Sequence, residues 1–300
     1  MLDFKPITPS DRLLYEKYLL DSERRGCEYS FLNVFLWGEQ QFAETDGCLV
    51  LLSHFGDYTA YSYPLGKGDI KSAIEKIIAD AKERKFDCRL NGVMPSEKEF
   101  IEKAFPDTFI FSTNRDTYDY IYDIEALSTL SGKKYHSKRN FINRFEESYP
   151  NAKTELLNSE NILLVWDMAE KWFLEKEALL GEGAFALERA AIRRLSENFS
   201  ELSPEGLILK SNDELLAFTV GTLFYEDTFD VHFEKALRDL DGAYPLINRE
   251  FARHVKANYP LVKYLDREED MGLEGLRRAK ESYRPLYLCE KWRAQLLEDK

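Results

Sequence analysis

The spacing of hydrophobic positions changes several times along the chain, and the changes mark two successions of strands and helices. In the first succession, alternating apolar residues at 48–55 and 58–63 predict two strands joined by a tight turn. Isoleucines and alanines at helical spacing over 70–81 predict an amphipathic helix with Asp69 as its N-cap. The remaining elements expected here are a short strand at 88–90, a helix at 96–104 and a strand at 109–111.

The same order of elements returns in the second half without a repeat of sequence. The expected elements are strands at 215–224 and 228–233, a helix at 244–256, a strand at 261–265, a basic helix that ends before Pro285, and a strand at 286–289. The repeated order predicts an α/β (α+β) protein of two modules, each a mixed, mostly antiparallel sheet flanked by helices. We place the boundary near residue 125, which gives modules 1–125 and 126–300.

Composition limits the possible classes of protein. The 300 residues are 44% hydrophobic, which is enough for about two domains with real cores. No run approaches the roughly 20 apolar residues of a membrane span, and the chain begins without a signal-peptide pattern. We therefore expect a cytoplasmic protein. The net charge of −13 argues against nucleic acid binding over the whole surface but permits a local basic patch.

One such patch lies at residues 133–145. It holds five bases and no acid: Lys133, Lys134, Lys138, Arg139 and Arg144. If it is helical, four further polar positions share one face, namely His136, Arg139, Asn140 and Asn143. We interpret the patch as a contact for an anion or a phosphate. The alternative is a solvated helix whose lysine stems cover apolar surface.

The segment 228–236 carries candidate acid–base groups. Strand alternation places Asp230, His232 and Glu234 on one face. Glu234 or His232 then serves as a general base or as an anchor for an amine. The alternative is a polar strand face in contact with water. No third histidine completes a zinc set, so we expect no metal.

Two glycine-containing turns precede helices in the second half. At Gly242 the turn frees backbone N–H groups that suit an anion. In the stretch 266–285, acids come before a Gly-x-x-Gly turn and bases come after it. We expect Asp270 to face a substrate ammonium, and Arg277 and Lys280 to face an anionic group. Dipole complementarity and an i,i+4 ion pair are the structural alternative for this helix.

Three groups of motifs together resemble a known family. They are Gly-Lys-Lys-Tyr-His-Ser-Lys-Arg-Asn-Phe-Ile-Asn-Arg-Phe at 132–145; Glu-Lys-Ala at 234–236 with Asp-Gly-Ala-Tyr at 241–244 and Ile247-Asn248; and Arg-Glu-Glu-Asp-Met-Gly at 267–272 with Gly-Leu-Arg-Arg-Ala-Lys at 275–280 and Ser282-Tyr283. This combination resembles the C-terminal domain of bacterial phosphatidylglycerol lysyltransferases, which also occurs alone in uncharacterised bacterial proteins. The resemblance implies two tandem GNAT-like modules akin to the Fem-type aminoacyltransferases. It also adds Asn248 to the candidate substrate contacts.

The resemblance implies an acyltransferase that moves an aminoacyl group from tRNA to an amine or hydroxyl acceptor such as a lipid headgroup. The first half has few convergent polar groups, so we expect the first module to be mainly structural. We expect the tRNA end or a phosphate-bearing small molecule to bind the basic patch. A second reading is an acyl-coenzyme A-dependent N-acyltransferase. The pyrophosphate loop of GNAT enzymes is not cleanly matched, however, because Arg-Asp-Leu-Asp-Gly-Ala at 238–243 is off by one and carries two acids. A third reading is a non-catalytic binding protein on the same fold. No cofactor is firmly implied, and the oligomeric state stays open.

Overall fold

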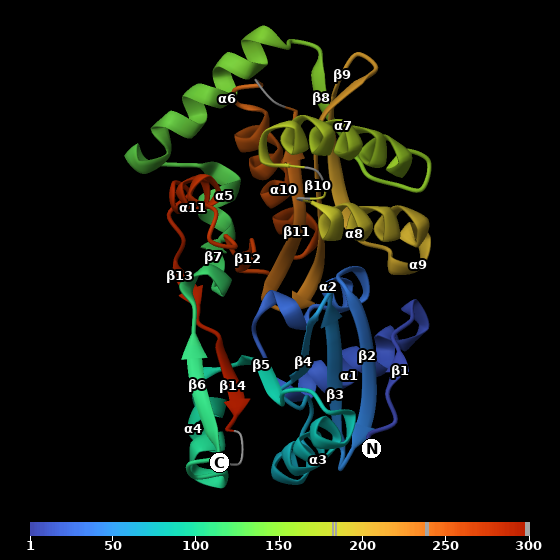
Figure 1. Cartoon of the computed structure of the whole chain (residues 1–300). Helices are drawn as coiled ribbons and strands as arrows, with labels where there is room; N and C mark the ends of the chain where they lie inside the picture. The colour runs from blue at the N-terminus through green and yellow to red at the C-terminus, as the bar shows by residue number, and fades with distance from the viewer. Residues whose placement is uncertain (182, 184, 238–239, 298–300) are drawn as a thin grey trace. The chain divides into compact units, whose positions relative to one another are not determined.

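The structure, a computed structural model, describes residues 1–181, 183, 185–237 and 240–297 (Figure 1). These residues form two compact units. Unit 1 contains Met1–Asp119, Glu269–Leu273 and Cys289–Lys300, and unit 2 contains Tyr120–Glu268 and Glu274–Leu288. Each unit thus draws on separate stretches of chain, whereas the expected modules 1–125 and 126–300 are consecutive.

Unit 1 is built on a seven-stranded sheet of order β1-β2-β3-β4-β5-β14-β6. The strands are β1 Lys5–Pro6, β2 Glu39–Thr45, β3 Cys48–Phe55, β4 Tyr58–Ser62, β5 Arg89–Val93, β6 Phe109–Thr113 and β14 Trp292–Leu296. The helices are α1 Arg12–Ser22, α2 Phe31–Leu36, α3 Ile70–Arg84 and α4 Pro95–Ala104. The apolar stripe of α3 is buried, and Asp69 caps the helix by accepting the Ser72 N–H at 3.0 Å, as predicted.

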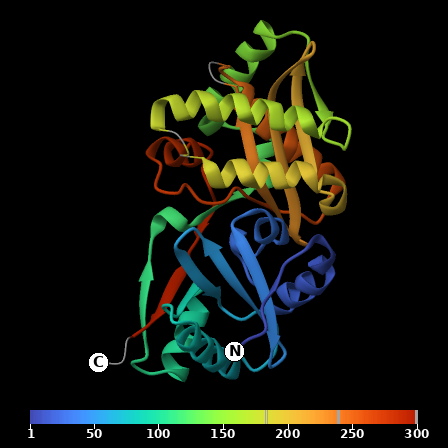
Figure 2. The same cartoon turned by 45° about the vertical axis from the view of Figure 1, so that its right-hand side comes forward.

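Unit 2 is built on a second seven-stranded sheet, of order β13-β7-β12-β11-β10-β9-β8. The strands are β7 Asp119–Asp123, β8 Ala152–Leu156, β9 Glu205–Ser211, β10 Glu214–Tyr225, β11 Thr228–Ala236, β12 Tyr264–Asp266 and β13 Tyr287–Cys289. The helices are α5 Ile124–Thr129, α6 His136–Ser148, α7 Ile162–Leu180, α8 Ala186–Glu197, α9 Phe199–Leu202, α10 Ala243–Asn258 and α11 Glu274–Glu281. Figures 1 and 2 show α7 and α8 side by side over this sheet.

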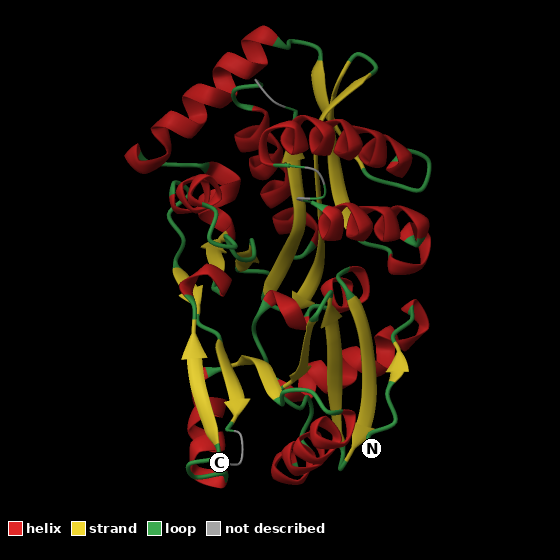
Figure 3. Ribbon diagram, in the orientation of Figure 1, coloured by secondary structure: helices red, strands yellow, loops and turns green. Residues whose placement is uncertain are grey.

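The two sheets have the same strand plan. Figure 3 colours their strands yellow and the flanking helices red. In each, one parallel pair, β4–β5 or β11–β12, interrupts antiparallel neighbours. The expected order of hairpin, helix, strand, helix and strand is present in both units. The predicted fold of two mixed sheets flanked by helices is therefore confirmed.

Each sheet contains one strand that follows, in the sequence, an edge strand of the other sheet. β7 comes after β6 but pairs with β12, and β14 comes after β13 but lies between β5 and β6. The sequence did not predict β14, because a stretch such as Trp-Arg-Ala-Gln-Leu becomes a strand only through these distant partners. None of the helices in the described residues is both long enough and apolar enough to span a membrane.

Candidate functional site

The parallel strands of unit 2 part at their carboxyl ends. β11 and β12 are paired only from Thr228 with Tyr264 to Asp230 with Asp266. β12 stops there, while β11 continues to Ala236. The side chains of His232 and Glu234 therefore meet those of Glu268 and Arg267 across the gap between the diverging backbones. This is the position in the fold at which the candidate site lies.

Glu234 is the centre of that site. Its Oε1 accepts a hydrogen bond from Arg267 Nη2 at 2.7 Å, and its Oε2 accepts one from Asn248 Nδ2 at 3.0 Å. The two charged side chains are only 8% and 11% exposed. Burial is the largest single influence on the pKa of Arg267 and lowers it, but Glu234, Tyr122 and Tyr283 together outweigh burial and raise the pKa of the guanidinium. Asn248 of α10 thus holds the carboxylate of this buried pair in place.

Polar atoms beside Glu234 lack partners among the described residues. They are Arg267 Nη1, Asn248 Oδ1 and Thr219 Oγ1. Thr219 is the register partner of Glu234 on β10, and Asn248 is 2% exposed. A buried polar group without a hydrogen bond costs about 1–3 kcal/mol, so three around one carboxylate indicate a place for a polar ligand. The ligand that fits offers an acceptor to Arg267 and a donor to Asn248.

Lys138 and Tyr283 lie next to this group. Lys138 Nζ is 3.9 Å from the centroid of the Tyr283 ring, and Arg267 Cζ is 4.7 Å from the same centroid. Burial, and then the charge of Arg267, lower the pKa of Lys138 to about 8, while Glu234 opposes the shift. Lys138, one of the bases predicted to contact an anion, thus lies beside Glu234.

The expectation that Asp230, His232 and Glu234 share one strand face is wrong. The register of β10 with β11 shifts between Val220 and Gly221, which leaves His232 as an extra residue, a β-bulge. Before the bulge, the Phe229 ring packs edge-to-face against Phe251 of α10, with ring centroids 5.8 Å apart. After the bulge, Glu234 accepts a hydrogen bond from Asn248 of the same helix. Phe229 and Glu234 therefore face the same side of the sheet although they are five positions apart, because the bulge between them reverses the alternation of side chains.

His232 belongs to a neighbouring cluster. Its Nε2 is 2.8 Å from Thr222 Oγ1, and its Nδ1 is 3.1 Å from Glu268 Oε1 and 3.5 Å from Asp230 Oδ2. The ligand atoms of Asp230, His232 and Glu268 lie within 4.8 Å of one another, close enough to hold a metal ion. A neutral imidazole that donates to Glu268 and accepts from Thr222 satisfies the same geometry. The expectation of no metal stays a prediction.

Helix α6 presents part of the predicted anion face. His136, Asn140 and Asn143 are exposed, and Asn140 Nδ2 lies 3.2 Å from His136 Nε2. Arg139 does not join them, since its guanidinium donates to the carbonyls of Leu130 and Gly132 before the helix. An open hollow of about 540 Å³ is lined by Ser137, Asn140, Phe141, Asn143 and Arg144. Lys134 is exposed on the preceding turn, over the Tyr135 ring at 5.0 Å.

Gly242 has a packing role at the start of α10. A Cβ atom there would lie 2.2 Å from Phe141 O of α6, and its φ of +98° suits glycine. The helix N-terminus offers few free donors, because Ala243 N bonds to Leu240 O at 3.1 Å and Pro245 has no N–H. Residues 238–239 of the Arg-Asp-Leu-Asp-Gly-Ala pattern lie outside the described residues.

Helix α11 fixes the backbone of the site through Lys280. The buried Lys280 ammonium donates to the carbonyls of Arg267 and Glu268, which fixes the chain just after β12. Arg277 is half-buried, and Glu274 and Arg278 form the expected i,i+4 pair at 3.3 Å. The contacts of Lys280 are those of a positioning group, and its predicted role toward a phosphate has no support in them.

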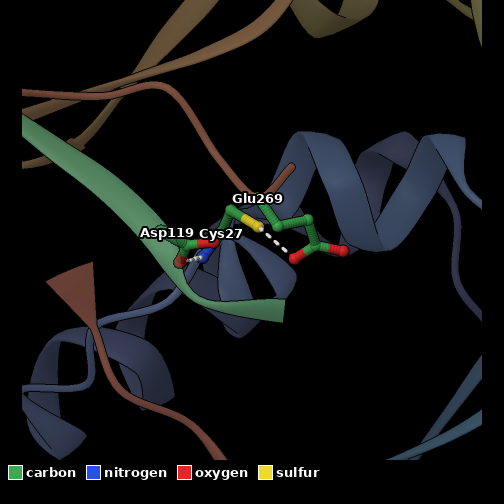
Figure 4. A group of neighbouring side chains, drawn as sticks. All are labelled: Cys27, Asp119 and Glu269. Carbon is green, nitrogen blue, oxygen red and sulfur yellow. Dashed lines mark hydrogen bonds between the residues drawn. The ribbon is translucent and has the colours of Figure 1, made fainter. Parts of the chain in front are cut away.

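Asp270 lies in unit 1, fully buried. It is 3.1 Å from Arg115 Nη1 and accepts the Gly272 N–H at 2.9 Å, so its carboxylate is already bound. Nearby in unit 1, Cys27, Asp119 and Glu269 converge (Figure 4). The buried Lys291 ammonium lies among them, 2.8 Å from Asp119 Oδ1 and 3.7 Å from Cys27 Sγ. A cation is therefore already present in this second metal-like group.

The parting of β4 and β5 in unit 1 is filled by protein side chains. Tyr29 Oη donates to the carbonyls of Asn91 and Gly92, at 3.1 and 3.2 Å. Arg24, which is 2% exposed, also donates to Gly92 O at 3.2 Å. The expected structural role of the first half stays a prediction, and the candidate site belongs to unit 2.

Comparison with known proteins places these residues in a family. The family model for the C-terminal region of phosphatidylglycerol lysyltransferase matches residues 21–295. The chain belongs to this family. An uncharacterized protein of Mycoplasmoides gallisepticum is 23% identical over 204 residues, which cover 67% of this chain but only 62% of that relative.

Solved structures agree with the family and with the fold. A conserved protein of unknown function from Bacteroides thetaiotaomicron is 39% identical, with a TM-score of 0.91 over 99% of this chain and 100% of that one. The L-PGS of Bacillus licheniformis is 15% identical, with a TM-score of 0.65 over 97% and 93% of the two chains. A tandem GNAT protein from the clavulanic acid pathway is 10% identical, with a TM-score of 0.51 over 100% of both. The expected likeness to the lysyltransferase family and to GNAT proteins is confirmed.

Sequence reasoning missed three members of the site in this lysyltransferase-family chain, namely Arg267, Tyr283 and Thr219. Arg267 and Tyr283 lie in the motifs that carry the resemblance, but the sequence predicted no contact for either, and Thr219 lies outside those motifs. Arg267 stood in a run of acids, where a pairing with Glu234 across the gap was not visible. The available signal was that Arg267 and Tyr283 fall inside the motifs at 267–272 and 282–283.

Proposed function

We propose that the chain is an aminoacyltransferase that moves an aminoacyl group from aminoacyl-tRNA to an amine or hydroxyl acceptor. The observation that carries the proposal is the set of unpartnered atoms around Glu234. An aminoacyl ester has an α-ammonium, which donates, and a carbonyl oxygen, which accepts. Glu234 and Asn248 Oδ1 suit the ammonium, and Arg267 Nη1 suits the carbonyl oxygen.

This arrangement supports ester aminolysis or transesterification. The acceptor's lone pair attacks the carbonyl carbon, and Arg267 stabilises the oxyanion that forms. The ester C–O bond then breaks, a new C–N or C–O bond remains, and the acceptor's proton ends on the tRNA hydroxyl. Holding the α-ammonium at Glu234 orients the carbonyl for this attack. No redox partner or metal takes part in such a step.

The tRNA end is proposed to bind along α6. Lys133 and Lys134 are exposed, and Arg144 is 60% exposed beside the hollow of α6. Because the chain as a whole carries −13, binding of a polyanion depends on such local bases. A cytoplasmic location follows from this donor.

An acyl-coenzyme A donor is the second candidate. Its pyrophosphate would need backbone N–H groups at the start of α10. One of these groups is bonded to Leu240 O, and Pro245 lacks one. Asp241 adds a negative charge next to the same turn. These features favour the tRNA donor.

The test is binding of charged tRNA over a range of salt concentrations. Each phosphate contact should add roughly 0.7–0.9 to the slope of log affinity against log salt. Replacement of Lys133, Lys134 and Arg144 by Gln should lower that slope, while Lys82→Gln on the exposed side of α3 should not. Absent binding, or affinity without a salt slope, contradicts the proposal. Thermal stabilisation by acyl-coenzyme A alone supports the second candidate, and tRNA binding without transfer to any acceptor supports a non-catalytic protein.

A further inference from the structure

The open hollow beside α6 combines an aromatic ring, two carboxamides and a cation. It measures about 540 Å³ and is lined by Ser137, Asn140, Phe141, Asn143 and Arg144. Pockets for small molecules typically measure roughly 300–1,000 Å³. The Phe141 ring is half-buried, and Arg144 Cζ lies 4.7 Å from its centroid. Unpaired RNA bases stack on aromatic rings and on guanidinium planes, so this pair of side chains offers a platform for a nucleobase.

The two asparagines supply hydrogen-bonding groups at the same hollow. Asn is a poor helix former, yet both residues lie within α6 and are exposed. Asn140 Nδ2 is 3.2 Å from His136 Nε2, whereas the Asn143 amide makes no hydrogen bond to any described residue. A carboxamide presents a donor and an acceptor side by side, which complements N7 and N6 of adenine but not the two acceptors of guanine. The amides therefore favour adenine.

The charge at the hollow suits a nucleotide. Residues 133–145 hold five bases and no acid. Arg144 is 60% exposed, and its Nη2 is 4.0 Å from the Oδ2 of Asp241, which is 78% exposed. An exposed ion pair of this kind is weak, so the Arg144 guanidinium can turn to a phosphate instead.

The hollow also lies close to the ester that Glu234 is proposed to hold. Lys138 lies beside Glu234, and Phe141 follows Lys138 by three residues on α6, about 4.5 Å along the helix axis. In an aminoacyl-tRNA the nucleoside that bears the ester is the terminal adenosine. Its base must therefore lie within the length of one nucleoside from Glu234.

We propose that the hollow binds the base of this terminal adenosine, with Phe141 and Arg144 stacked against the ring and the amides of Asn140 and Asn143 on its edge. The inference rests on the proposed function, because it takes an aminoacyl-tRNA as the donor. It adds the part of α6 that recognises a base to the bases that contact phosphates.

The experiment titrates AMP, GMP and CMP into the full chain by calorimetry. The wild type should bind AMP at least about fivefold more tightly than GMP or CMP. The double variant Asn140→Ala/Asn143→Ala should lower this preference to less than about twofold, and alanine favours the helix, so the variant should stay folded. Phe141→Leu should weaken the binding of AMP at least about fivefold through lost stacking.

Two controls identify the contacts. Ser148→Ala, at an exposed position of α6 outside the hollow, should leave both affinity and preference unchanged. Arg144→Gln should weaken all three nucleotides by a similar factor, because a phosphate contact carries no information about the base. Circular dichroism of each variant confirms that it is folded.

The outcomes separate this inference from the proposed function. Equal affinity for AMP and GMP, or an unchanged preference in the double variant, overturns the inference alone, since charged tRNA can still bind with a salt slope. A preference for AMP that depends on the two asparagines, together with binding of charged tRNA, supports it. Coenzyme A that binds through the same asparagines while charged tRNA does not bind overturns both the tRNA end as the occupant and the proposed function.

Discussion

Glu234 and Arg267 form a buried ion pair, 2.7 Å between Oε1 and Nη2, across the point where β11 and β12 diverge. Neither residue belongs to the paired part of the two strands. A neighbouring contact crosses the same gap, from His232 to Glu268 at 3.1 Å. Beyond the paired residues, β11 and the segment after β12 are thus joined by side-chain contacts instead of backbone pairing.

Removal of one partner of this pair should destabilise the protein strongly. Arg267→Met leaves the Glu234 carboxylate buried without its cation, and we expect a loss of about 3–5 kcal/mol in unfolding free energy. Urea denaturation followed by tryptophan fluorescence measures it. The double variant Glu234→Gln/Arg267→Met should lose less than the single one, because no charge is left unpaired. A loss below about 1 kcal/mol for Arg267→Met would show that the pair is not buried as described.

Gly242 should tolerate no side chain. Gly242→Ala brings a Cβ to 2.2 Å from Phe141 O at a positive φ, so α6 and α10 must separate. We expect a loss of at least about 1–3 kcal/mol. The matched control is Gly275→Ala in α11, where a Cβ meets nothing within 4 Å; helix propensity predicts a gain of up to about 1 kcal/mol there. Equal stability of the two variants would refute the close packing.

Loss of β14 should open the sheet of unit 1. Deletion of residues 290–300 removes the strand between β5 and β6, including Ala294, which is fully buried. Hydrogen exchange should then speed up at the amides of β5 and β6, while those of β10 and β11 stay protected. Full protection of β5 in the shortened chain would contradict the observed strand order.

Lys138 should give the protein a distinct pH response. Its folded pKa of about 8 lies below the unfolded value of about 10.4. Between these pH values the unfolded chain binds more protons at this site than the folded one, so stability should rise with pH. Anion binding by the ammonium should fall as pH passes 8. Lys138→Met should abolish both effects, whereas Lys171→Met, at an exposed position of α7, should leave them unchanged. Denaturation at different pH values measures the stability effect, and NMR titration of the lysine side chain measures the pKa. A titration midpoint near 10 in the folded protein would exclude the shift.

Local pattern was enough for much of the fold. The cap at Asp69, the helix stripe of α3 and the hairpin of β10 and β11 depend on residues within a few positions of each other. The repeated order of elements then indicated two similar sheets. These features could be predicted because each is stabilised by its own segment.

The rest depended on contacts between distant residues. The bulge at His232 reverses the faces of β11, yet β11 itself has no glycine or proline there, and the glycine at the register shift, Gly221, lies on the partner strand β10. Arg267 pairs with Glu234 over 33 positions, and β14 pairs with β5 over some 200, so neither was visible in a local window. Lys138 was predicted as a base among five, and only packing against Tyr283 distinguishes it from the others.

The most direct test of the account is transfer from aminoacyl-tRNA by the Glu234→Gln variant. Gln keeps the shape of the side chain but removes the charge that is proposed to hold the α-ammonium. Single-turnover loss of labelled amino acid from tRNA, in the presence of amine and hydroxyl acceptors, should slow by at least about 100-fold, while tRNA affinity and its salt dependence stay at wild-type values. Transfer at the wild-type rate by Glu234→Gln would contradict the account.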